Sequence, residues 1–128
     1  MASKGYRYDR IPGADNSAAI STKQIQNPAY ATTIALANLD TEHNTIDFKK
    51  LTGDLSVTAD VANAYTGDRM TCLFAADSSG DRTVTFSTGF AANGTLTVLD
   101  DAIAVVEFVF TTTGLWLEVS RFISAELA

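Results

Sequence analysis

Length, composition and charge set the first limits on this chain. Of its 128 residues, 46% are hydrophobic and 19% are charged, which is the composition of one ordinary globular domain and not of a disordered segment. A net charge of -6 argues against a nucleic-acid partner, because binding phosphates requires a basic face. No apolar stretch follows the first residues, so we expect a protein made in the cytoplasm, with no secretory signal and no membrane span.

Residues 1–29 predict an extended N-terminal arm. They mix glycine and proline with polar residues and show no helical apolar pattern. They hold four basic and two acidic residues, a balance of +2, whereas the rest of the chain holds five basic and thirteen acidic residues, a balance of -8. A basic arm could therefore dock on the acidic body of another subunit, and the alternative is a solvated tail.

Tyrosine and arginine alternate within this arm, at Tyr6, Arg7, Tyr8 and Arg10. On an extended backbone the two tyrosines lie on one side, an arrangement suited to adding a strand to a neighbour's sheet or to filling its grooves. We interpret these four residues as candidate interface residues.

From Tyr30 onward the apolar residues recur at every second position, which is the period of a half-buried strand. Turn signals separate these segments at 66–68, at 77–81 and at Asn93-Gly94, and the last two are typical of hairpin loops. The predicted inward faces include Ile34, Leu36, Ile46, Phe48, Leu55, Val57, Met70, Cys72, Phe74, Val84, Phe86, Leu96, Val98, Ala104, Val106, Phe108, Phe110, Leu115, Leu117 and Val119.

Short strands at this spacing, with no helix-length segment between them, predict an all-β fold. We expect an antiparallel β-sandwich or jelly-roll-like barrel of about eight strands, with residues 30–128 as the body and 1–29 as the arm. Many threonines fall opposite the apolar face, where a β-branched polar residue suits an exposed pleat.

Trp116 alternates with Leu115 and Leu117, so its side chain is predicted to lie away from the core. A partly exposed tryptophan indicates a subunit interface. The alternatives are a platform on which sugars stack and a second small core.

Residue types that carry chemistry are few. His43 is the only histidine and lies in a polar segment between strands, while Cys72, the only cysteine, lies in an apolar alternation as a packing residue. Asp100 and Asp101 are adjacent in a turn and should point apart. The cluster at 77–81 offers oxygen ligands for calcium but lacks the spacing of an EF-hand loop. We therefore expect no enzyme activity, no metal site and no cofactor.

Three stretches carry a recognisable pattern, at residues 53–90, 94–110 and 114–121. Their most specific parts are Gly67-Asp68-Arg69, the strand Thr83 to Phe86 with Gly89-Phe90, and Trp116 to Arg121. They resemble a β module of tailed-phage virion proteins, found in head decoration (cement) or head-fibre components. The resemblance implies a structural protein that is typically trimeric and sits on the capsid exterior or in fibres. It does not cover the arm.

These observations lead to a functional hypothesis. The chain is expected to be a capsid decoration protein that binds itself, as a homotrimer, and the major capsid protein, with no nucleic-acid or membrane partner. The alternative is a fibre or tail-tip domain that binds a receptor or carbohydrate, where Trp116, Tyr65 or Tyr30 would stack on sugars.

Overall fold

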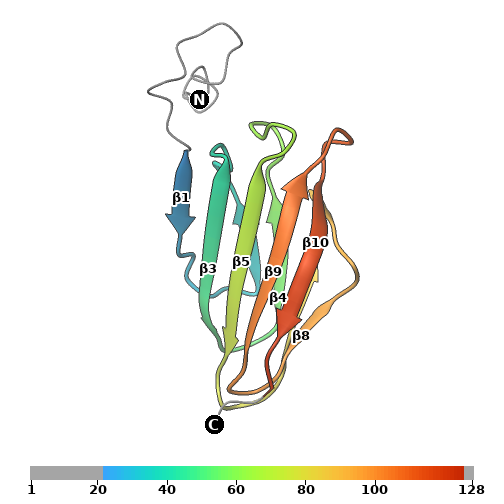
Figure 1. The fold of residues 1–128 in the computed structure, drawn as a ribbon. Helices are drawn as coiled ribbons and strands as arrows, with labels where there is room; N and C mark the ends of the chain where they lie inside the picture. The colour runs from blue at the N-terminus through green and yellow to red at the C-terminus, as the bar shows by residue number, and fades with distance from the viewer. Residues whose placement is uncertain (1–21, 126–128) are drawn as a thin grey trace, which may run out of the picture.

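The computed structural model describes residues 22–125, and within this range the protein is all-β with no helix. Two sheets face each other, and Figure 1 looks onto the larger one with strands of the smaller one behind it. The strands are β1 (Lys23–Gln26), β2 (Thr33–Leu36), β3 (His43–Leu51), β4 (Leu55–Ala59), β5 (Arg69–Ala76), β6 (Arg82–Phe86), β7 (Phe90–Ala91), β8 (Leu96–Val98), β9 (Ile103–Phe110) and β10 (Trp116–Ile123).

The first six strands wind as a coil. Successive strands alternate between the sheets, so that β1, β3 and β5 lie parallel in the six-stranded sheet and β2, β4 and β6 lie parallel in the four-stranded sheet. This is a short β-solenoid, in which each turn adds one strand to each sheet. The expected antiparallel sandwich or jelly-roll barrel is therefore wrong, although the expected all-β class is confirmed.

Antiparallel pairing is confined to the later strands. In the six-stranded sheet, whose order is β1-β3-β5-β9-β10-β7, β9 runs antiparallel to both β5 and β10. In the four-stranded sheet, whose order is β2-β4-β6-β8, the last strand runs antiparallel to β6. The coil thus ends where β9 in one sheet and β8 in the other run opposite to the coiled strands.

Two loops that were predicted to form hairpins connect one sheet to the other. The loop at 77–81 joins β5 to β6, and Asn93-Gly94 lies between β7 and β8, so in both cases the flanking strands belong to different sheets. The glycines do adopt the positive φ that the turn signals predict, 153° at Gly80 and 81° at Gly94. The predicted glycine conformations are confirmed, but the conformation of a turn does not determine which strands pair.

The core fills the space between the two sheets. The predicted inward residues of β2 to β6, β8 and β9 are buried there, except that Phe86 is only partly buried. Aromatic rings run through the core: Phe48 stacks on Phe74 with centroids 4.6 Å apart, and Phe86 meets Phe108 edge-on at 5.2 Å. Cys72 is fully buried in this core, which confirms its packing role, and burial raises the pKa of its thiol.

The sheet begins earlier in the chain than the predicted boundary. Strand β1 lies within the range 1–29 that was assigned to the arm, and it pairs with β3 in the register Lys23 with His43. Residues 1–21 lie outside the described residues. The short strand β7 was also not predicted, because two residues are too few for a period to appear.

Gly89 forms a tight corner just before β7. Its φ is 93°, its carbonyl accepts a 2.9 Å hydrogen bond from the Trp116 amide, and a Cβ at this position would collide with the backbone carbonyl of Ala59. Only glycine fits both the backbone conformation and the close approach of the two sheets.

Candidate interaction surface

The outer face of the six-stranded sheet carries a contiguous apolar patch near the ends of β3 and β5. Strand pairing places Leu73 beside Val105 and Ala75 beside Ile103, and Phe122 on β10 is the next partner of Val105. We call these five residues the apolar strip. Their side chains alternate with buried core residues such as Phe74 and Ala104, so they point away from the core.

The strip combines exposed and half-buried side chains. Phe122 is 62% exposed and Ile103 is 44% exposed, while Leu73, Ala75 and Val105 are half-buried. Single exposed apolar residues are common on proteins, but a contiguous group marks a site of interaction.

A shallow groove of about 390 Å³ lies on the strip, lined by Leu73, Ala75, Ile103 and Val105. Two charged residues of β3, Asp47 and Lys50, also line it. The groove is therefore apolar, with one acidic and one basic group at the side of β3.

The other end of the same face mixes basic and polar residues with exposed apolar ones such as Ile25 and Leu117. The register aligns Lys23, His43 and Arg69 on three neighbouring strands, beside a hollow of about 670 Å³. His43 is exposed there as the first residue of β3. Its predicted place in a loop is therefore wrong, because the strand begins at this residue.

The outer face of the four-stranded sheet differs from the strip. Thr33 and Thr85 flank Ser56 in register, and Thr83 pairs with Thr97, so neighbouring strands present hydroxyl groups to solvent. None of these side chains is buried. The threonines thus lie on the exposed pleat, as predicted.

Trp116 does not lie on the surface, and its prediction as an exposed interface residue is wrong. Its side chain is fully buried, its ring meets Phe110 edge-on at 5.1 Å, and its indole N–H donates to the Asp60 carbonyl at 3.3 Å. The neighbours predicted to face the core are instead exposed, Leu117 by 45% and Leu115 by 38%. A buried ring is unavailable for stacking on a sugar or for contact with a partner.

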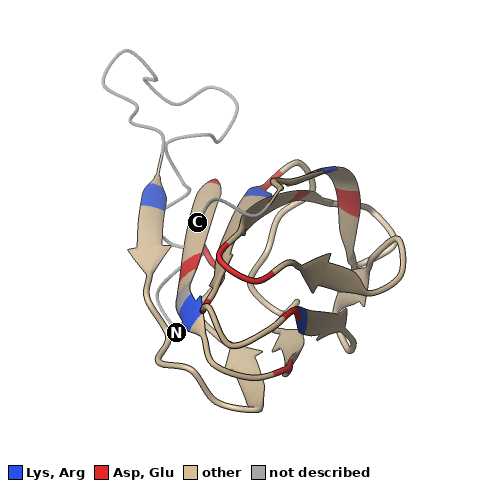
Figure 2. Ribbon diagram, turned by 90° about the horizontal axis from the view of Figure 1, so that it is seen from below, with Lys and Arg blue, Asp and Glu red and all other residues tan. Residues whose placement is uncertain are grey.

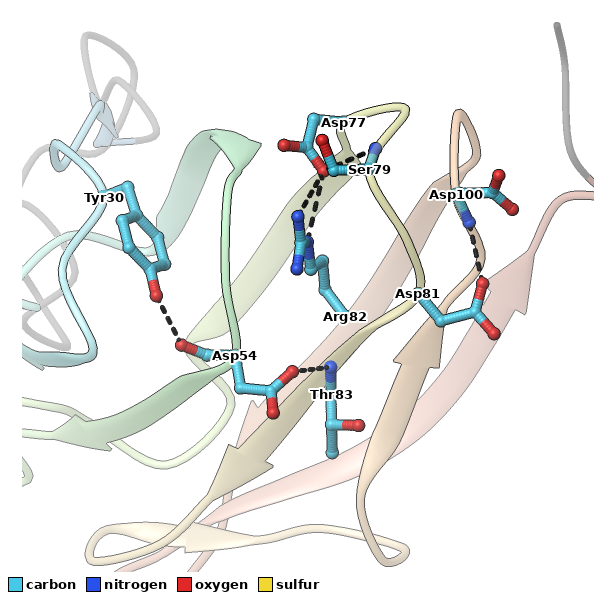
Figure 3. A network of polar contacts seen from close by, with 8 residues as sticks. All are labelled: Tyr30, Asp54, Asp77, Ser79, Asp81, Arg82, Thr83 and Asp100. Carbon is cyan, nitrogen blue, oxygen red and sulfur yellow. Dashed lines mark hydrogen bonds and ion pairs between the residues drawn. The ribbon is translucent and has the colours of Figure 1, made fainter.

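The other predicted interface residues, Tyr6, Arg7, Tyr8 and Arg10, lie outside the described residues. Tyr30, one of the rings proposed to stack on sugars, is half-buried, packs against the core and donates its hydroxyl to the Asp54 carbonyl at 2.8 Å (Figure 3).

Aspartates in the loop between β5 and β6 stabilise turns. Asp77 forms a 2.7 Å ion pair with Arg82 and accepts a hydrogen bond from the Ser79 amide (Figure 3). The hydrogen bond from Arg82 lowers the pKa of Asp77. Asp81 accepts instead from the Asp100 amide at 3.0 Å. Among the residues that the structure describes, no group of three acidic, histidine or cysteine side chains is placed to hold a metal ion.

Acidic residues occur on several connecting loops of the body (Figure 2, red). Beside these loops, Glu118 forms a 2.6 Å ion pair with Arg121, which also donates to the Thr95 carbonyl at 2.9 Å. The hydrogen bond from Arg121 lowers the pKa of Glu118, and the same contact raises the pKa of Arg121. This pair attaches the 93–95 loop to β10, so its role is to stabilise the fold.

Two features were missed from the sequence. The strip leaves a signal, because Ile103, Val105 and Val109 make β9 apolar at alternate positions on its outer side as well as its inner side. The buried Asn44 also follows the period of Ile46, and its amide oxygen accepts from Gln24 at 2.8 Å while its nitrogen donates to the Arg69 carbonyl at 3.1 Å. Asn44 thereby links β1, β3 and β5 at one end of the sheet.

Comparison with known proteins adds no family. No protein-family model matches the chain, and no curated protein matches it either. Within residues 22–125 there is no helix that is both long and apolar enough to span a bilayer.

Proposed function

We propose that this chain is a structural virion protein of a tailed phage: a capsid decoration, or cement, protein that works by binding other protein subunits. The observation that carries the proposal is the apolar strip, because a contiguous exposed apolar group on a sheet face is typical of a protein interface. The resemblance of residues 53–121 to phage virion modules supports the choice of a virion among protein assemblies.

The proposed partners are further copies of the chain, as a homotrimer, and the major capsid protein. The arm residues Tyr6, Arg7, Tyr8 and Arg10 are proposed to contact the capsid, since aromatic and arginine side chains supply the anchors of many interfaces. The acidic body would then remain on the capsid exterior. The proposal includes neither catalysis nor a cofactor.

Such a protein stabilises a shell by mass action. A ligand that binds only the assembled shell favours it by RT ln(1 + [L]/Kd), so about 100-fold excess over Kd gives about 2.7 kcal/mol per site. Several weak sites on one oligomer add their effects through avidity.

The test is co-sedimentation of the purified chain with shells assembled from the major capsid protein, followed by heating of the shells. We expect the chain to pellet with shells and to raise their disruption temperature. Replacing all four arm residues by alanine should reduce the bound fraction, whereas a Thr85→Ala variant on the opposite sheet should not. A wild-type chain that stays in the supernatant at every concentration would refute the proposal.

A further inference from the structure

The apolar strip is organised in two rows that cross the strands, and each row ends in one charged residue on β3. The register gives these rows directly, as Asp47, Leu73, Val105 and Phe122 in the first and Lys50, Ala75 and Ile103 in the second. The two charges have opposite signs.

This pattern is complementary to itself. When two copies face each other with their strands antiparallel, the first row of one copy lies over the second row of the other. The β3 strands then face each other, Lys50 of each copy lies opposite Asp47 of the other, and the apolar residues of the rows meet beside these pairs. Face-to-face packing of sheets with nearly aligned strands is a common arrangement.

We propose that the partner of the apolar strip is a second copy of this chain. The inference rests on the proposed function in taking the strip as a protein contact, and it assigns that contact to self-association and not to the capsid. Because a two-fold contact joins only two copies, it is separate from the contacts of the proposed homotrimer. The overall charge of -6 makes two copies repel at long range, so a contact between them needs a surface that is apolar and locally neutral. The strip meets both conditions.

The N-terminal segment 1–21 is another candidate occupant of the strip, and the experiment below separates that case.

The experiment measures the mass of the full chain by light scattering. The wild type should have at least twice the 13.6 kDa of one chain, and Phe122→Glu and Ile103→Glu should each halve the wild-type mass. Both side chains are exposed, so far-UV circular dichroism should remain unchanged. The matched control is Ile25→Glu on β1, an even more exposed apolar residue at 70%, which should keep the wild-type mass.

Charge reversal tests the register of the contact. Asp47→Lys places two like charges opposite each other and should raise the dissociation constant of the oligomer at least tenfold. Adding Lys50→Asp in the same chain should restore most of the affinity. A double variant as weak as the single one would overturn the antiparallel register.

A monomeric wild type, or a Phe122→Glu variant with undiminished mass, would overturn the proposal. If the wild type is monomeric but the four-alanine arm variant associates, the arm is the occupant of the strip and the proposal is equally wrong. The capsid assay fails separately. An oligomer that ignores shells removes the proposed function and leaves this inference, whereas a monomer that pellets with shells removes this inference and the proposed homotrimer but leaves the capsid binding.

Discussion

Replacing Trp116 by alanine tests the side of β10 that faces the core. The structure buries this side chain completely and leaves the adjacent Leu117 45% exposed, whereas the alternation of the sequence suggests the opposite. Removing a buried tryptophan destabilises a protein by about 3–5 kcal/mol, through lost burial and the cavity that remains. Leu117→Ala removes a side chain that is only about half-buried, so its expected cost is about 1 kcal/mol.

These costs translate into separate urea midpoints. A domain of this size unfolds with a free energy of about 5–15 kcal/mol and a slope of about 1–3 kcal/mol per molar urea. A loss of about 4 kcal/mol therefore lowers the midpoint by about 1–4 M, and the Leu117 variant shifts it by less than half as much. Far-UV circular dichroism reports both transitions, since Trp116→Ala removes the tryptophan signal.

The wild type gives a second readout, because Trp116 is the only tryptophan. Its native emission should be blue-shifted relative to the unfolded chain and poorly quenched by acrylamide. If Trp116→Ala does not fold, Trp116→Phe should lower the midpoint by a smaller amount. A native emission that acrylamide quenches as strongly as in urea, or a larger midpoint shift for Leu117→Ala than for Trp116→Ala, would refute the assigned orientation.

Three further outcomes follow from individual residues. Gly89→Ala should lower the urea midpoint sharply, because it forces alanine into positive φ and against the Ala59 carbonyl; Gly94→Ala, with the same sign of φ but open space, should lower it less. Cys72 should react with Ellman's reagent only at the rate of unfolding, and immediate labelling of the native protein would contradict its burial. The pKa of Glu118 is lowered in the folded protein, so the stabilisation from its ionised form is present above the pKa of about 4.3 of an unfolded glutamate and is lost as the pH falls through the lower folded pKa. Glu118→Gln should therefore make the unfolding free energy decline less steeply in acid. An unchanged decline would argue against the ion pair with Arg121.

The sequence predicts most strands of this fold because their period of two is clear. Ile46 with Phe48 and Leu55 with Val57 alternate with polar residues, so one face of each strand is plainly apolar. The pairing of the strands has no such signal, since a half-buried strand alternates in the same way in parallel and antiparallel neighbours. The connection from β3 to β4 is short enough for a hairpin, yet it crosses to the other sheet.

The orientation of β10 shows why the predicted orientation of Trp116 is wrong. Leu115, Leu117 and Val119 are apolar at one set of alternate positions, and Trp116 is apolar at the other, so the period alone does not identify the inner face. Register decides it: Trp116 lies beside Phe90 on β7 and beside Phe110 on β9, which are both buried. That information comes from segments distant in sequence.

The winding of β1 to β6 leaves the two ends of the molecule unequal. At one end β9 and β8 run antiparallel to the coiled strands of their sheets, whereas at the other β1 and β2 are the outermost of the described strands. A duplicated segment that supplies one more strand to each sheet could therefore lengthen the protein at that outer end without disturbing Phe48 or Phe74 in the existing interior. Longer and shorter versions of this architecture are thus accessible by simple duplication or deletion of whole turns, and the size of the protein is open to evolutionary adjustment in discrete steps.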